Sequence, residues 1–214
     1  LKDAALKIGS DGAFGPLQVA EGLKTLALAG LTARQQLEAI PAVKIFATVG
    51  ETDLKASAET LVAVSTAYGY AAKDYGVVAD IVAKTAASSM ASVQDMSQAF
   101  RQASVVGQQY GVSLKDTALN LAMLAQIGIK GSAAGTSMRN MYTELMGSSE
   151  RARKILKEVL RVDAWDNAAK SMRPIGELMR DMADALSKMD TEKQQEALNK
   201  LGSERGTKNL AANL

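Results

Sequence analysis

The chain has 214 residues, enough for one sizeable domain or two small ones, and its 47% hydrophobic and 22% charged residues are typical of folded proteins. Aromatic residues make up only 4%, so the core must be built from aliphatic and small side chains, which pack well between helices. The absence of Cys and His excludes disulfides and thiolate metal sites and removes the commonest general base, while a net charge of +2 gives no argument for a nucleic-acid partner.

Charged residues interrupt the apolar stretches at regular intervals, so no run approaches the roughly 20 apolar residues that a membrane-spanning helix needs. We therefore expect no transmembrane segment in this part of the chain, no cofactor and no metal site. Because the usual catalytic side chains are scarce, we expect a structural protein without catalytic residues rather than an enzyme. No small-molecule substrate and no specific nucleic-acid ligand are predicted.

The first clear helix signal follows a glycine-containing loop. Pro16 can be the first residue of a helix. N–H groups in the first helical turn have no partner within the helix, so proline, which has no N–H, loses no hydrogen bond there. Leu17, Leu23 and Leu26 then recur at helical spacing and predict the side that is buried. Gly30 is expected to end this helix, because glycine readily adopts the left-handed conformation that often follows a helix.

Two more helices are predicted before residue 70. Thr32 is a candidate N-cap of the second helix, which should end or kink near Pro41. Asp53 is a candidate N-cap of the third helix, and Gly69 is expected to terminate it.

The most informative internal feature is a repeat. The pair Tyr68-Gly69, followed by Lys73-Asp74, returns 42 residues later as Tyr110-Gly111, followed by Lys115-Asp116, and Gly30 belongs to an earlier, weaker copy. Each glycine is expected to join two helices into an α-hairpin, which cannot bury its apolar face alone. The sequence therefore predicts an all-α fold of about three stacked α-hairpins, helix-turn-helix units with a period of about 40 residues.

Residues 128–136 are the part of the chain richest in small side chains. Gly128, Gly131 and Gly135 are predicted to be turn residues of a helix-loop-helix junction in which two backbones approach closely. A phosphate-binding loop is the alternative, but the Gly-Lys-Ser/Thr ending and the preceding strand are missing. Lys130 in this block and Arg139 after it are candidate contacts to a partner protein.

The composition becomes more charged beyond Gly147, and we place a domain boundary there. Residues 1–147 are predicted to form the helical-repeat core and residues 148–214 a small, charged, helical C-terminal subdomain. The helices expected in the second part cover residues 150–161, begin at Pro174 and begin at Asp190 or Thr191.

Two further residues are candidate partner contacts. Asp80 is a carboxylate inside a strongly apolar stretch, where it could bind a neighbouring helix or subunit, or instead point to solvent or pair locally. Trp165 is the only tryptophan, and it could anchor an interface or cover the junction between the two subdomains.

The order and spacing of these features resemble the shared core region of phage tail tape measure proteins. The segments that carry the resemblance are Ala29-Gly30-Leu31-Thr32, the two Tyr-Gly pairs, Val78-Ala79-Asp80 and, above all, Gly128 to Thr136. Similarity continues at lower specificity through Arg173-Pro174. Leu201 departs from the pattern, because such proteins commonly carry Phe before the corresponding Gly202.

The resemblance implies a structural virion component whose full-length molecule lies along the growing tail tube, determines its length and leaves the tube ahead of the DNA during genome ejection. An extended helix rises about 1.5 Å per residue, which supplies the ruler. With 17 glycines, this segment should instead be a compact module. The implied partners are other tape measure copies, the tail tube protein, the tail tip or baseplate hub and tail assembly chaperones, in the virion tail and, during assembly, in the host bacterial cytoplasm.

Two other functions stay open at this point. A peptidoglycan-cleaving tail module would need paired acids in a cleft, and the candidates in the family-like region are Glu21, Glu38, Glu59 and Asp80, none with an evident companion. A non-phage helical adaptor could be built from the same hairpins.

Overall fold

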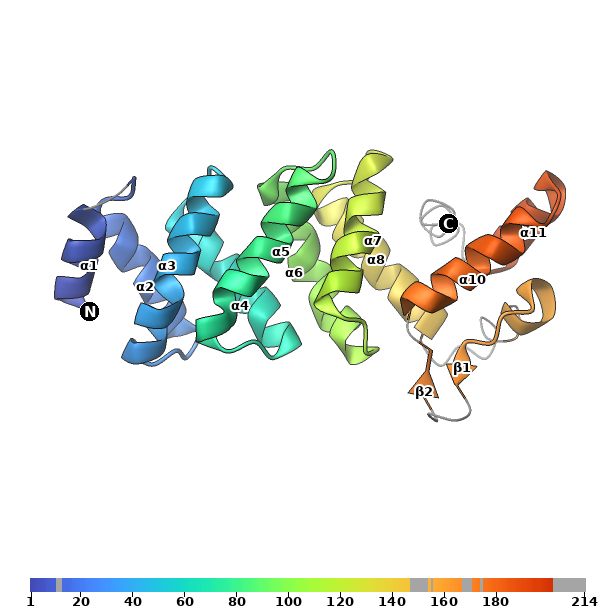
Figure 1. Ribbon diagram of the computed structural model, residues 1–214, viewed down its shortest axis with the longest axis horizontal. Helices are drawn as coiled ribbons and strands as arrows, with labels where there is room; N and C mark the ends of the chain where they lie inside the picture. The colour runs from blue at the N-terminus through green and yellow to red at the C-terminus, as the bar shows by residue number, and fades with distance from the viewer. Residues whose placement is uncertain (11–12, 147–153, 155, 167–170, 174, 202–214) are drawn as a thin grey trace.

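The computed structural model describes residues 1–10, 13–146, 154, 156–166, 171–173 and 175–201 (Figure 1). Almost all regular structure in these ranges is helical, which confirms the predicted all-α class. The α-helices are α1 (Lys2–Ser10), α2 (Pro16–Leu28), α3 (Ala33–Val49), α4 (Leu54–Tyr68), α5 (Tyr75–Ala87), α6 (Val93–Gln109), α7 (Leu114–Gln126), α8 (Gly131–Met146), α10 (Ile175–Ser187) and α11 (Thr191–Leu201). The short segments are η1 (Ala72–Asp74), η2 (Leu156–Leu160), and the antiparallel pair β1 (Trp165–Asp166) and β2 (Ser171–Met172). None of the helices described here is long and apolar enough to cross a bilayer.

The helices from α2 to α8 form two rows that run along the long axis of the molecule (Figure 1). In the even row, α2 packs on α4, α4 on α6 and α6 on α8, while in the odd row α3 packs on α5 and α5 on α7. Consecutive helices also pack on each other, so the core lies between the two rows. Each helix thereby covers apolar surface that its neighbours could not bury alone.

In both rows, the spacing between equivalent buried side chains is more regular than the spacing between the glycine junctions. The odd-row helices bury equivalent positions at intervals of 39 residues, including Ala39, Val78 and Thr117; Val43, Val82 and Leu121; and Ala47, Ala86 and Ala125. In the even row, Leu23, Leu61, Phe100 and Met138 are buried at intervals of 38, 39 and 38 residues. α1 continues this register, because its buried Ala5 and Gly9 lie 38 residues before Val43 and Ala47.

The glycine junctions follow a different spacing, because Gly30, Gly69 and Gly111 are 39 and 42 residues apart. After Gly69 the chain passes through η1 before α5 begins at Tyr75, whereas α7 begins three residues after Gly111. α6 spans 17 residues and α4 only 15. The longer α6 and the inserted η1 offset each other, so the buried positions of successive odd helices stay 39 residues apart.

Local signals account for the helix ends. The Thr32 hydroxyl accepts a hydrogen bond from the Gln35 N–H, and Gln35 Oε1 accepts one from the Thr32 N–H at 2.9 Å, which satisfies two N–H groups at the start of α3. Asp53 Oδ1 accepts from the Ala56 N–H at 2.7 Å and caps α4. The glycines that follow α2, α4, α6 and α7, each with a φ between +71° and +87°, are Gly30, Gly69, Gly111 and Gly128.

Two details of the first helices differ from expectation. Leu17 is 83% exposed rather than buried, because the buried side of α2 passes through Val19 instead. Of the two alternatives predicted at Pro41, an end of the helix is wrong, because α3 continues to Val49. Pro41 lies on the exposed side of the helix, where water can reach the Leu37 carbonyl that loses its backbone partner.

The C-terminal part is smaller and less regular. Of the helix expected over residues 150–161, the described residues form η2, a π-helical turn with buried Leu156 and Leu160, on which α10 and α11 pack. The Asp190 carboxylate accepts from the Lys193 N–H at 2.9 Å and caps α11. Gly147, Pro174 and Gly202 lie outside the described residues, so the division into residues 1–147 and 148–214 stays a prediction.

Candidate interaction surface

Two apolar grooves open on the outer side of the odd row. Groove A, of about 420 Å³, lies between α1 and α3 and is lined by Lys7, Ile8, Ile40, Pro41, Lys44 and Ile45. Groove B, of about 370 Å³, lies between α5 and α7 and is lined by Ile81, Lys84, Thr85, Ser88, Lys115, Ala118, Leu119 and Ala122. Both therefore combine an apolar floor with lysines at the rim.

The two grooves occupy equivalent positions two repeats apart. Pro41 of α3 and Leu119 of α7 are 78 residues apart, which is twice the 39-residue period. Lys7 of α1 and Lys84 of α5 are 77 residues apart, which is the sum of the 38-residue step from α1 to α3 and the 39-residue step from α3 to α5. The repeat between them contributes α5, and the residue of α5 that is equivalent to Pro41 and Leu119 is Asp80. The lysine-rimmed groove is therefore present at two positions that are two repeats apart.

The lysines differ in how their charge is balanced. Lys84 Nζ lies 2.6 Å from Asp80 Oδ2, and Lys44 Nζ donates to the Ile8 carbonyl at 2.9 Å. The ammonium groups of Lys7 and Lys115 have no ion pair or hydrogen bond with any residue that the structure describes. Among those same residues, no carboxylate lines either groove. The rim of groove A therefore carries the positive charges of Lys7 and Lys44. At groove B only the charge of Lys115 is uncompensated, because Asp80 pairs with Lys84.

Large apolar side chains stand exposed at the edge of each groove. Ile45 at groove A is 65% exposed and Leu119 at groove B is 61% exposed. A single exposed leucine is ordinary, but apolar side chains gathered around a concave, charged-rimmed surface are typical of interaction sites. This outer side of the odd row is the candidate interaction surface.

A buried hydroxyl network holds α7 in place behind groove B. Tyr68 Oη of α4 and Thr117 Oγ1 of α7 are 2.7 Å apart, and Thr117 Oγ1 lies 3.3 Å from Tyr142 Oη of α8. Asn120 Nδ2 also donates to Tyr142 Oη at 3.5 Å. Burial raises the pKa of Tyr68 to about 12 and also raises the pKa of Tyr142. Thr117 directly precedes Ala118 of the groove lining, so the network links the groove to the even row.

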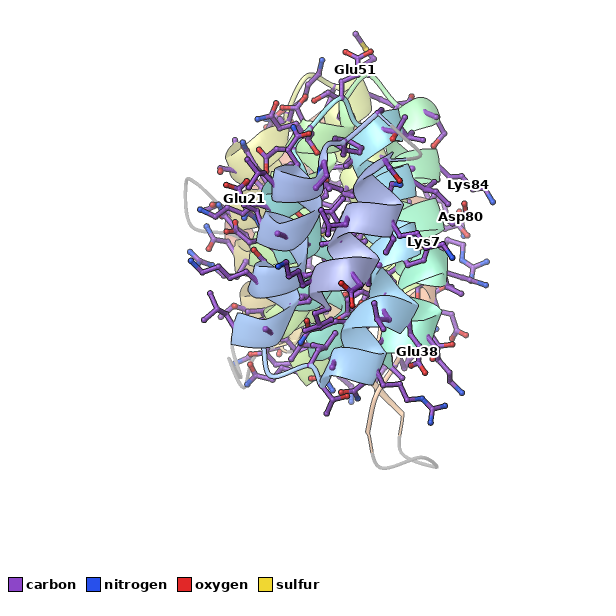
Figure 2. The ribbon with its side chains drawn as sticks, turned by 90° about the vertical axis from the view of Figure 1, so that its left-hand side faces the viewer. Lys7, Glu21, Glu38, Glu51, Asp80 and Lys84 are labelled. Carbon is purple, nitrogen blue, oxygen red and sulfur yellow. The ribbon has the colours of Figure 1, made fainter. Side chains whose placement is uncertain are left out.

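The predicted partner contacts do not form one patch. Asp80 lies beside groove B and pairs with Lys84, as the local-pairing alternative for this residue anticipates. Figure 2 shows both side chains on the same side of the molecule as Lys7. Arg139 is exposed on α8 of the even row, and Lys130 is half-buried in the connection before α8. The side chain of Trp165 lies outside the described residues.

The glycine-rich block is helical over much of its length rather than an open loop. Gly131, with a φ of +57°, is the first residue of α8, so the phosphate-loop alternative does not fit here. Gly135 lies inside α8 rather than in a turn, and a Cβ there would come within 2.6 Å of the Ala99 carbonyl of α6. The expected close approach of two backbones therefore occurs at a helix crossing.

The acids considered for peptidoglycan cleavage are dispersed. Glu38 lies 2.9 Å from Arg34 Nε and Glu59 lies 3.6 Å from Arg101 Nη1. Figure 2 shows Glu21 on the opposite side of the molecule from Glu38 and Asp80. Within the described ranges, no group of three or more acidic residues is placed to hold a metal ion.

Comparison with known proteins adds an independent line of support. The chain matches the family described as phage-related minor tail protein over residues 2–202. It is 31% identical over 194 residues to the tape measure protein of Pneumococcus phage Dp-1, which covers 91% of this chain and 17% of that protein. It is 26% identical over 188 residues to the probable tape measure protein of Escherichia phage P2, which covers 88% of this chain and 23% of that protein. The chain thus spans about a fifth of the length of these curated relatives, and no solved structure gives a significant match.

Proposed function

This chain belongs to the family of phage-related minor tail proteins, and from that premise we propose that it is a folded assembly module of a tape measure protein. Two relatives that carry this name align with most of the chain, in agreement with the resemblance seen in the sequence. Because the chain belongs to this family, we drop the alternative of a helical adaptor unrelated to phages. The module would work in the virion tail and, during assembly, in the host cytoplasm.

The pair of equivalent grooves carries the assembly part of the proposal. Fully burying one exposed leucine side chain contributes about 1.5 to 3 kcal/mol, so a partner that covers Leu119 and its neighbours gains a substantial part of a stable contact. The same surface recurs at groove A, which offers a second contact on the same side of the odd row. The module would therefore hold the tape measure protein to other parts of the tail.

The elongated remainder of the protein, rather than this module, would determine tail length. A single helix of 214 residues would span about 320 Å at 1.5 Å per residue, whereas the helices here fold back into two rows. The relatives are four to six times longer than the aligned region, which leaves room for such a rod. The partners that we propose for the module are other tape measure copies, the tail tube protein, the tail tip or baseplate hub and tail assembly chaperones.

We propose that the module acts by contact rather than by catalysis. Glycoside cleavage uses two convergent carboxylates, whereas Glu38, Glu59 and Asp80 each lie beside an arginine or lysine on separate helices. Zymography on purified cell wall tests this part directly. The proposal predicts no clearing, and clearing that disappears when one of these acids is changed to its amide would overturn it.

The assembly role is tested in a phage that encodes the full-length protein with Ile45→Asp and Leu119→Asp. Placing a carboxylate at the edge of each groove should lower the number of assembled tails counted by electron microscopy about tenfold, because the apolar contact is lost. The matched control carries Leu17→Asp and Leu28→Asp, two residues of α2 that are 83% and 80% exposed. Normal tail numbers in the groove variant would contradict the proposal.

A further inference from the structure

We propose that grooves A and B each bind an acidic amphipathic α-helix of another tail protein. The apolar side of that helix would lie on the groove floor, and its carboxylates would face the lysines at the rim. This inference rests on the proposed function and adds the chemistry of the partner.

The charge of the rim selects the partner. Groove A contains Lys7 and Lys44, and neither forms an ion pair with a described residue. Groove B contains Lys115, which has no ion pair with a described residue, and Lys84, whose charge is balanced by Asp80 beside the lining. Electrostatic complementarity between rims chooses among partners and sets the rate of encounter. A partner with carboxylates beside its apolar stripe satisfies this rim, whereas a basic partner is repelled.

The shape of the floor selects a helix. The grooves lie between neighbouring odd-row helices, which is the arrangement that receives an amphipathic helix through side chains at positions i, i+3, i+4 and i+7. In groove B, Ala118 and Ala122 are small enough to let a helix approach the floor, and Leu119 at the edge would pack against its apolar side. The lining from α5 and its C-cap runs from Ile81 to Ser88, or about two helical turns.

The acidic helix α10 of this chain is not a free occupant for the grooves. α10 is acidic and amphipathic, with Glu177, Asp181 and Asp184 in its sequence. Its apolar Leu178 and Met182 are, however, fully buried, so that side of α10 is already covered. α10 therefore does not supply the acidic helix that we propose.

Site-specific cross-linking in assembled tails tests the inference. The full-length protein carries a photoreactive benzoyl-phenylalanine at position 119 in one phage and at position 17 in a control phage, and cross-linked peptides are identified by mass spectrometry. We expect position 119 to capture a peptide of a different tail protein, with Asp or Glu flanking a helical apolar stripe. Position 17 should not capture that peptide.

Charge reversal gives the second measurement. Adding Lys84→Glu and Lys115→Glu should lower the yield of the position-119 cross-link about tenfold, whereas Lys24→Glu and Lys55→Glu, on exposed positions of the even row, should leave it unchanged. A cross-link only to a second copy, to a peptide without acidic residues, or with a yield insensitive to charge reversal would overturn the inference and leave the tail assignment intact. Absence of the protein from purified tails would instead remove the proposed function and the inference together.

Discussion

Tyr68 and Thr117 lie 49 residues apart in the sequence, yet their hydroxyl oxygens are 2.7 Å apart between α4 and α7. The same threonine hydroxyl lies 3.3 Å from Tyr142 Oη of α8, so one buried polar group joins three helices from both rows. Buried hydroxyls need such partners, because an unpaired one keeps its full desolvation cost. This network therefore contributes both to stability and to the position of the odd-row helix that lines groove B.

Replacing Thr117 by Val should lower the free energy of unfolding by about 2 to 3 kcal/mol, because it removes the shared partner of the half-buried Tyr68 hydroxyl and the buried Tyr142 hydroxyl. Tyr68→Phe should cost only about 1 kcal/mol, since it removes one member of the pair. Urea denaturation followed by circular dichroism measures both. Tyr110→Phe is the control, because the Tyr110 hydroxyl has no hydrogen-bond partner among the described residues. Equal costs for Thr117→Val and Tyr110→Phe would contradict the network.

Stability should fall at alkaline pH. Burial raises the pKa of Tyr68 from 10.0 to about 12, so the folded state holds its proton more tightly than the unfolded state. Its contribution is complete below pH 10 and is lost as the pH rises from 10 to 12, with a total of about 2 to 3 kcal/mol. Denaturation curves at pH 9, 10, 11 and 12 should be less pH-dependent for Tyr68→Phe than for the wild type. Parallel curves for the two proteins would refute the assignment.

Two glycines in α-helices should respond to alanine in opposite directions. At Gly135 the added Cβ would lie 2.6 Å from the Ala99 carbonyl, so Gly135→Ala must separate α6 from α8 and should cost about 1 to 3 kcal/mol. At Gly76 nothing lies within 4 Å, so Gly76→Ala should stabilise α5 by about 0.4 to 1 kcal/mol. Thermal unfolding gives both values. If Gly135→Ala stabilises the protein as Gly76→Ala does, the α6–α8 crossing is looser than described.

The junction glycine after α4 should tolerate asparagine better than valine. Gly69 has a φ of +71°, a conformation that costs most L-residues about 1 to 2 kcal/mol and β-branched residues more. Gly69→Val should therefore lower the unfolding free energy by at least about 1 kcal/mol, and Gly69→Asn by clearly less. The two variants are compared by denaturant unfolding. If they are equally stable, backbone conformation is not the reason for glycine at this position.

Much of the fold could be predicted, because the helix ends depend on neighbouring residues. Pro16, Thr32 and Asp53 begin helices as their local chemistry requires, and Gly30 and Gly69 follow helices in the left-handed conformation. The small-residue run also predicted a close approach. It could not distinguish a turn from a crossing at Gly135, since small residues suit both.

The grooves could not be predicted, because they depend on which outward positions become neighbours. Pro41, Asp80 and Leu119 are equivalent in the three odd helices, yet only the first and last line a groove. Their equivalence follows the 39-residue period of the buried side chains, whereas the Tyr-Gly pairs repeat at 42 residues because η1 shifts the junction. Lys7 belongs to α1, a nine-residue helix that completes groove A and that precedes the first helix whose bounds are predicted.

The central claim, that the outer side of the odd row faces other tail proteins, is tested most directly by oxidative footprinting. Ile45, Leu119 and Met123 of this side are compared with Leu17, Leu28 and Val105 of the even row, in the purified chain and in assembled tails. Contact through the grooves predicts that the first three lose reactivity at least fivefold in tails while the second three change little. Undiminished reactivity at Ile45 and Leu119 in tails that contain the protein would contradict the claim.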